Sequence, residues 1–214
     1  MTLLWIALSF FAGSLMFSYW LGLAAKRDLR AVGDGNPGAL NLWKAAGCRL
    51  GLLGIALDFL KGYVPTVWIA GTVHAEGGLL VPLALAPIAG HAFSPFLRGR
   101  GGKAIAVSFG VWSALTGFEA SLAYAIILAL LKAFVRYRTR GKPSAESDGL
   151  QVMGGMLLLV LYLGLRSYPV AILGVGLGNF AILAYKHRAE WRSRMQKGAA
   201  SDRRSGEKEN YTKM

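Results

Sequence analysis

The residues best suited to chemistry lie in a glycine-rich loop between two long apolar runs. Residues 33–41 contain three glycines, one proline and two asparagines. Glycine permits positive φ and close backbone approach, so such a loop can aim successive N–H groups at one anion. Arg30, Lys44 and Arg49 place positive charge nearby. The pattern predicts a phosphate-binding loop, although an ordinary connecting loop has the same composition.

A second basic glycine loop runs from Arg98 to Lys103, where Gly99, Gly101 and Gly102 accompany three cations. Flexible backbone donors beside cations suit a phosphate group. Anchoring by positive charge at a membrane surface would explain the cations but not the glycines. We therefore expect this loop to bind phosphate as well.

Ionisable side chains also interrupt the apolar runs. Asp58 and Lys61 are three residues apart and so share one helical face. Charges inside a membrane span are costly and usually functional, although a self-neutralising pair is an equally good interpretation. His91 ends the third apolar run, where a lone histidine is more often structural than catalytic. No histidine, cysteine or acidic cluster has metal-ligand spacing, so we expect no metal or other cofactor.

The composition indicates an integral membrane protein. The chain is 54% hydrophobic and 16% charged, whereas a soluble domain carries about 25% charged residues. The net charge of +13 is confined to short blocks between apolar runs. A nucleic-acid partner is disfavoured, because these blocks lack interleaved stacking aromatics. One cysteine allows no disulfide framework.

The apolar runs predict an all-α polytopic bundle of about seven transmembrane helices. The fourth and fifth runs are short enough to form a re-entrant pair instead, which would leave five crossings. The connection 132–149 is predicted to be the longest polar loop. The runs are residues 3–25, 50–70, 79–97, 104–115, 120–134, 150–165 and 169–185.

Charge then predicts the orientation. Nearly all of the 24 basic residues fall on alternate connections, and positive loops face the cytoplasm. The N-terminus should therefore lie outside and the C-terminus inside. No cleavable signal is expected, because no basic residue precedes the first run. Residues 1–197 should form one transmembrane domain, and residues 198–214 a disordered cytoplasmic tail that touches anionic membrane lipid.

Taken together, the loops resemble those of the acyl-phosphate-dependent glycerol-3-phosphate acyltransferases of bacteria, the PlsY family. The resemblance extends from about Gly13 to Lys197. The matching motifs are Asp28 to Asn41, Asp58-Phe59-Leu60-Lys61-Gly62, Gly90-His91-x-Phe93 followed by Arg100-Gly101-Gly102-Lys103, and His187-Arg188.

The resemblance implies transfer of a fatty acyl group from acyl phosphate to glycerol 3-phosphate, giving lysophosphatidic acid. Acyl phosphate is already activated, so no covalent acyl-enzyme is required and a donor phosphate oxygen can take the hydroxyl proton. The site would face the cytoplasm of a bacterial inner membrane. The enzyme that makes acyl phosphate and the second acyltransferase of the pathway are implied partners.

The resemblance also assigns roles to residues. Asn36 with Gly35 and Gly38 would cradle one phosphate, while Lys103 with Gly101 and Gly102 would neutralise the other. His91 would donate a hydrogen bond or position the acyl donor, and Lys61 would neutralise substrate charge or hold Asp58. Asn41 would orient the first loop. The catalytic candidates are His91, Lys103 and Asn36; the substrate-binding candidates are Gly33, Asp34, Gly35, Gly38, Asn41, Lys44, Arg49, Asp58, Lys61, Gly101, Gly102, His187 and Glu190.

At two positions this chain has a carboxylate where the family pattern has a neutral residue. Asp34 replaces the usual serine and Glu190 the usual asparagine, and both would repel a phosphate unless protonated or paired with arginine or lysine. An altered acceptor, reduced activity, or a non-catalytic paralogue that binds or transports lipid or anions all stay open. Uncharged departures are Leu40, Ala92, Ser94 and Ala104.

Overall fold

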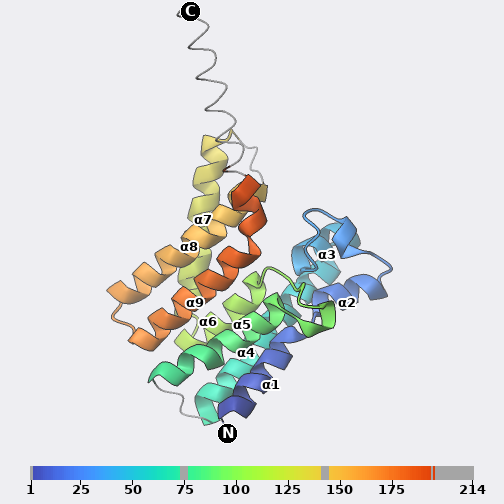
Figure 1. The fold of residues 1–214 in the computed structure, drawn as a ribbon. Helices are drawn as coiled ribbons and strands as arrows, with labels where there is room; N and C mark the ends of the chain where they lie inside the picture. The colour runs from blue at the N-terminus through green and yellow to red at the C-terminus, as the bar shows by residue number, and fades with distance from the viewer. Residues whose placement is uncertain (1, 73–76, 141–144, 194, 196–214) are drawn as a thin grey trace, which may run out of the picture.

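The computed structural model describes residues 2–72, 77–140, 145–193 and 195 (Figure 1). Throughout these residues the regular structure is helical. Three short 3-10 turns, η1 (Leu29–Ala31), η2 (Gly77–Leu79) and η3 (Pro95–Leu97), accompany the α-helices. In chain order these are α1 (Thr2–Ser14), α2 (Phe17–Ala24), α3 (Ala39–Ala46), α4 (Cys48–Thr72), α5 (Leu80–Ala92), α6 (Ile105–Thr116), α7 (Glu119–Arg138), α8 (Ala145–Leu165) and α9 (Val170–Lys186).

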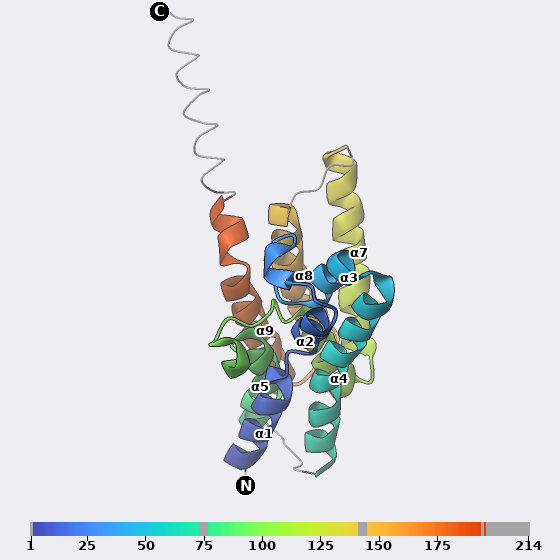
Figure 2. The same ribbon diagram turned by 90° about the vertical axis from the view of Figure 1, so that its right-hand side faces the viewer.

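The helices form a polytopic membrane bundle, as the apolar runs predict. Five segments of the described chain are long and apolar enough to cross a bilayer, and α6 and α9 are shorter apolar helices. Figure 2 shows the start of α1, the end of α4 and the start of α5 at one end of the bundle. The end of α7 and the start of α8 lie at the other end. Which end faces the cytoplasm remains a prediction. The division into residues 1–197 and 198–214 also remains a prediction, because residues 198–214 lie outside the described residues.

The first apolar run is not one continuous helix, contrary to the prediction. α1 ends at Ser14, α2 begins at Phe17, and Figure 1 shows α2 turning away from the direction of α1. The break frees backbone carbonyls inside the bundle, where each needs a donor. Ser94 Oγ donates to the Ser14 carbonyl at 2.7 Å, and Lys61 Nζ donates to the Leu15 carbonyl. Hydroxyl and ammonium donors from α4 and the loop after α5 thus stabilise the turn.

The predicted polar loop 132–149 is largely helical. α7 continues to Arg138 and α8 begins at Ala145. Charge ended the apolar pattern at Lys132, but lysine and arginine are good helix formers. Arg136 and Arg138 also lie in the last turn, where cations interact favourably with the helix dipole. The prediction was wrong because it equated the end of apolarity with the end of the helix.

α4 and α6 pack with their backbones in close contact beside the site. A Cβ on Gly62 would overlap the Val107 carbonyl, and one on Gly110 would overlap the Phe59 carbonyl. Small residues allow helices to approach this closely within a membrane. The contact fixes the α4 face that carries Asp58 against the start of α6.

α6 to α9 enclose the largest apolar core. Trp112, Tyr124, Met156 and Leu159 are fully buried there. The Tyr124 hydroxyl donates to the Val152 carbonyl at 2.9 Å, which ties α7 to α8. This core therefore supports α6 and α7, which carry residues that line the site.

Candidate active site

A cavity of about 750 Å³ opens between α4, α6 and α7. Its polar end is formed by Asn36, Asp58, His91 and Lys103, which come from four separate parts of the chain. The remaining wall is mostly apolar, with the hydroxyls of Ser113 and Ser121 as its polar groups. It is lined by Leu40, Ile55, Phe59, Ile105, Phe109, Phe118, Leu122 and Ala125.

The first glycine loop folds around the carboxylate of its own residue Asp34. Asp34 Oδ1 accepts the Asn36 backbone N–H at 3.2 Å and Asn41 Nδ2 at 2.8 Å. Asn41 Nδ2 also donates to the Asn36 carbonyl at 2.9 Å. Gly33 and Gly35 have φ of 60° and 71°, which lets the loop reverse there. Donors that the sequence offers to a phosphate are thus partly occupied by Asp34.

Lys103 bridges the two carboxylates that depart from the family pattern. Its ammonium lies 2.5 Å from Asp34 Oδ2 and also pairs with Glu190. Burial raises the pKa of Asp34, but the Lys103 ammonium and the donors of the loop outweigh burial and hold that pKa below its usual value. Burial lowers the pKa of Lys103, while Asp34 and Glu190 raise it above the usual value overall. Asp34 is therefore paired and ionised, one of the two states expected from the sequence.

The second glycine loop is held by a lysine that the sequence did not single out. Lys186 Nζ, at the end of α9, donates to the Ala92 carbonyl at 2.9 Å and to the Gly101 carbonyl at 2.8 Å. The Gly102 N–H donates to the His91 carbonyl at 3.1 Å. Lys186 looked like the first charge of a basic tail, and no local spacing distinguishes it from the other tail cations.

Gly102 lies directly against the His91 ring, and a Cβ there would overlap His91 Nε2. We expect Gly102→Ala to lower the rate of the reaction at this site by about a hundredfold, because a shift of about 1 Å in a positioned group has that order of effect. Initial rates of the purified protein in detergent measure this. Gly154→Ala is the control, since a Cβ at Gly154 meets nothing within 4 Å. Equal rates for both variants would show that the His91 position is not critical.

Asp58 anchors a buried cluster behind the polar end of the cavity. Ser18 Oγ donates to Asp58 Oδ2 at 2.6 Å, and Lys61 Nζ lies 2.8 Å from Asp58 Oδ1. His91 Nδ1 is 3.9 Å from the same oxygen. Asp58 and His91 line the cavity, whereas Lys61 does not. Of the two roles expected for Lys61, the geometry favours holding Asp58.

The other predicted residues lie at the edge of the site or outside it. Lys44 and Arg49 do not line the cavity. His187 is buried with its Nδ1 3.8 Å from Glu190 Oε2. Burial and then the Lys103 charge lower the pKa of His187 to about 4, so this histidine is neutral at pH 7 and the contact is not an ion pair.

The bundle and its cavity fit the class of integral membrane enzymes whose substrates have an apolar chain and a charged end. A long apolar wall next to a lysine and two glycine loops can hold an acyl chain and its charged end in one volume.

Comparisons with known proteins agree with this class. The family model for glycerol-3-phosphate acyltransferase matches residues 3–197. Glycerol-3-phosphate acyltransferase 1 of Thermotoga maritima is 38% identical over 193 residues, which cover 87% of this chain and 94% of that protein. Glycerol-3-phosphate acyltransferase 1 of Deinococcus radiodurans is 31% identical over 206 residues, 96% of each chain. The chain belongs to the glycerol-3-phosphate acyltransferase family and is a membrane acyltransferase of phospholipid synthesis.

Solved structures share the fold. The crystal structure of PlsY (YgiH), an integral membrane glycerol 3-phosphate acyltransferase, in its glycerol 3-phosphate form superposes with a TM-score of 0.79 at 27% identity, covering 92% of each chain. Its lysophosphatidic acid form gives 0.77 at 26% identity, with the same coverage. The expected PlsY-like fold is confirmed.

Proposed function

We propose that this chain transfers a fatty acyl group from acyl phosphate to the 1-hydroxyl of glycerol 3-phosphate, giving lysophosphatidic acid and inorganic phosphate. The observation that carries the proposal is one cavity that joins Lys103 and the first glycine loop to an apolar wall. The glycerol 3-phosphate and lysophosphatidic acid forms of the structurally similar PlsY support the choice of acceptor and product.

The acyl chain would lie along Phe59, Phe109 and Leu122, with its carbonyl near His91 and Lys103. The acceptor hydroxyl oxygen forms a bond to the carbonyl carbon, and the bond from that carbon to the phosphate oxygen breaks. The departing phosphate takes the hydroxyl proton, so neither a side-chain base nor an acyl-enzyme is needed. Lys103, Asn36 and the backbone of Gly38 would stabilise the charge on phosphate.

A donor phosphate would compete with Asp34 and Glu190 for the Lys103 ammonium. We expect Asp34→Ser to lower the KM for acyl phosphate by about tenfold, because charge-assisted hydrogen bonds of Lys103 become free for substrate. The measurement is the initial rate of lysophosphatidic acid formation by purified protein with labelled glycerol 3-phosphate. Asp148→Ser removes an exposed carboxylate of α8 outside the cavity and is the control.

The same assay separates the remaining interpretations. A higher KM in Asp34→Ser would mean that Asp34 helps to bind substrate. Activity only in Asp34→Ser, or only in Glu190→Asn, would mean that the wild-type chain has left the reaction but keeps its scaffold. No turnover by any folded form, with glycerol 3-phosphate still bound, would favour a non-catalytic lipid- or anion-binding paralogue. The Asp34–Lys103–Glu190 contact is the observation that favours that alternative.

The setting of the reaction is part of the proposal. The basic loops would face the cytoplasm of a bacterial inner membrane, where the enzyme that makes acyl phosphate and the second acyltransferase would meet this chain. Residues 1–197 would form the catalytic domain, with residues 198–214 as a tail near anionic lipid. Labelling of single cysteines from either side of the membrane tests the orientation.

A further inference from the structure

A second, smaller cavity lies apart from the active site and is lined by arginines. Its volume is about 350 Å³, and it shares no lining residue with the larger cavity. The walls come from α2, η1 and the loop after α5. We call it the arginine pocket; its lining residues are Tyr19, Arg30, Phe96, Leu97, Arg98 and Arg100.

The arginine pocket gathers positive charge without an internal counter-ion. Among the ion pairs of the described residues, none joins Arg30, Arg98 or Arg100 to a carboxylate. Arg30 stacks over the Tyr19 ring with its guanidinium carbon 5.5 Å from the ring centroid. Three cations around one volume repel one another, and an anion bound between them would remove that repulsion. Guanidinium groups match the oxygens of a phosphate in paired hydrogen bonds.

The backbone places one of these arginines at a conformational cost. Arg98 caps η3 with φ of 53°, in the left-handed region that favours glycine. Gly99, with φ of 75°, follows directly. Strained non-glycine residues concentrate at functional sites, where the side chain is needed in that place. This turn places the Arg98 side chain in the lining of the pocket.

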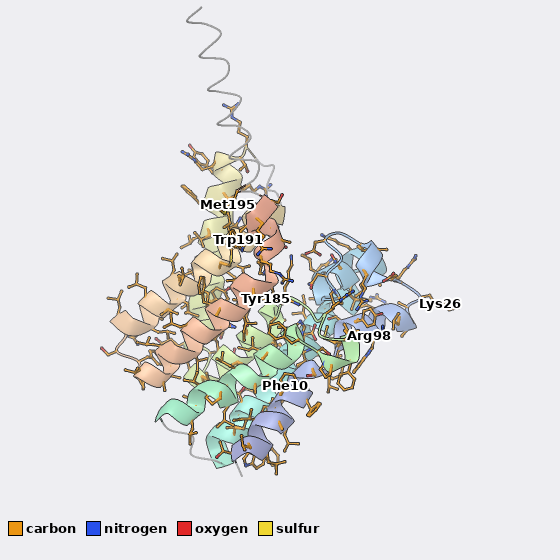
Figure 3. All side chains as sticks on the ribbon, viewed as in Figure 1. Phe10, Lys26, Arg98, Tyr185, Trp191 and Met195 are labelled. Carbon is orange, nitrogen blue, oxygen red and sulfur yellow. The ribbon has the colours of Figure 1, made fainter. Side chains whose placement is uncertain are left out.

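The arginine pocket lies where two membrane segments end. Tyr19 and Trp20 are near the end of the candidate span Thr2–Ala24, and Leu97 ends the span Gly77–Leu97. The Trp20 and Phe96 rings meet at 5.8 Å between centroids, and both side chains are exposed. Figure 3 shows Arg98 beside α2, where these two segments come together. Exposed aromatic rings at span ends mark the depth of lipid headgroups.

We propose that the arginine pocket binds the phosphate of an anionic glycerophospholipid from the surrounding bilayer. Arg30, Arg98 and Arg100 hold the phosphate, and Phe96 and Trp20 lie against the apolar part of the lipid. Arg100 directly precedes Gly101, Gly102 and Lys103, so a bound headgroup also steadies the loop that reaches the active site. Binding at this pocket does not depend on acyl transfer.

The test is a lipid titration of the full-length protein in detergent, followed by intrinsic tryptophan fluorescence. The probes are short-chain phosphatidylglycerol, short-chain phosphatidylcholine and inorganic phosphate. We expect saturable binding of phosphatidylglycerol that weakens by about tenfold in Arg98→Gly and in Arg30→Gln, because each loses charge-assisted hydrogen bonds. Arg98→Gly also relaxes the backbone, so its thermal stability should not fall. Arg136→Gln, at the exposed end of α7, is the matched control and should bind as the wild type does.

Three results would overturn the proposal. The first is no saturable binding of phosphatidylglycerol by folded protein. The second is an equal loss in Arg136→Gln, which would show unspecific surface charge. The third is binding of inorganic phosphate as tight as that of the lipid, which would make a soluble anion the ligand. If the wild-type protein binds phosphatidylglycerol as expected but transfers no acyl group, the proposed function fails and the lipid site stands.

Discussion

Replacing Lys103 with alanine should lower acyl transfer by about a hundredfold or more while the protein stays folded in membranes. Lys103 is the cation that lines the large cavity, next to the loop that would cradle phosphate. Removing one donor that stabilises developing charge has an effect of this order in other acyl-transfer sites. The variant also leaves Asp34 and Glu190 without their shared partner, so the remaining charge at the polar end repels an anionic substrate.

Two comparisons make the Lys103 result specific. Lys132→Ala removes an exposed cation of α7 that does not line the cavity, and it should retain full activity. The variant that combines Lys103→Ala with Asp34→Ser and Glu190→Asn removes the repulsion but not the need for a cation. It should stay well below the wild type. Full activity of folded Lys103→Ala would remove this lysine from the site.

Replacing Asp58 with alanine should cost about 3–5 kcal/mol of stability, because it leaves Lys61 as an unpaired buried charge. Both side chains of the pair are 2% exposed. Asp58 also accepts the Ser18 hydroxyl, and Lys61 donates to the carbonyl at the break between α1 and α2. Loss of the carboxylate should therefore loosen both the break and the wall behind His91. Thermal unfolding in detergent and the yield of assembled protein measure the effect.

A double variant separates charge from packing in this cluster. Asp58→Leu combined with Lys61→Met removes both charges, and neutral replacements of a buried pair are often tolerated. We expect the double variant to recover part of the stability lost in Asp58→Ala, because the unpaired charge is gone but the Leu15 carbonyl still lacks its Lys61 donor, and not to recover the activity. If Asp58→Ala unfolds at the wild-type temperature, the pair does not support the fold.

The apolar runs predicted the bundle well because a membrane span must satisfy its backbone internally and needs a fixed length of apolar sequence. They did not predict the break after Ser14. That break depends on donors from Lys61 and Ser94, which are distant in sequence. No local residue type marks it, and only the packed bundle brings those donors to the carbonyls.

The sequence likewise predicted some residues of the candidate site and missed others. Glycine and charge patterns identified the two loops whose residues Asn36 and Lys103 line one cavity. The family resemblance added His91, which lies near the end of α5 and lines the same cavity. The sequence could say only that Asp34 and Glu190 must be protonated or paired with a basic residue. It could not identify Lys103 as the partner of Glu190, because these two residues are 87 apart in the chain. The role of Lys186 was missed for the same reason, since its acceptors are carbonyls of another segment.

The contact of Lys103 with Asp34 and Glu190 would affect how quickly inorganic phosphate leaves the site after the proposed reaction. Groups tethered in one chain act on each other at high effective concentration. In the proposed reaction, both carboxylates would therefore recapture the Lys103 ammonium as soon as inorganic phosphate moves away. Release of product, rather than chemistry, limits turnover in many enzymes. Internal carboxylates of this kind lower the affinity for phosphate and shorten its residence time. In the proposed reaction, such a site would be inhibited less by high inorganic phosphate than a site without these carboxylates.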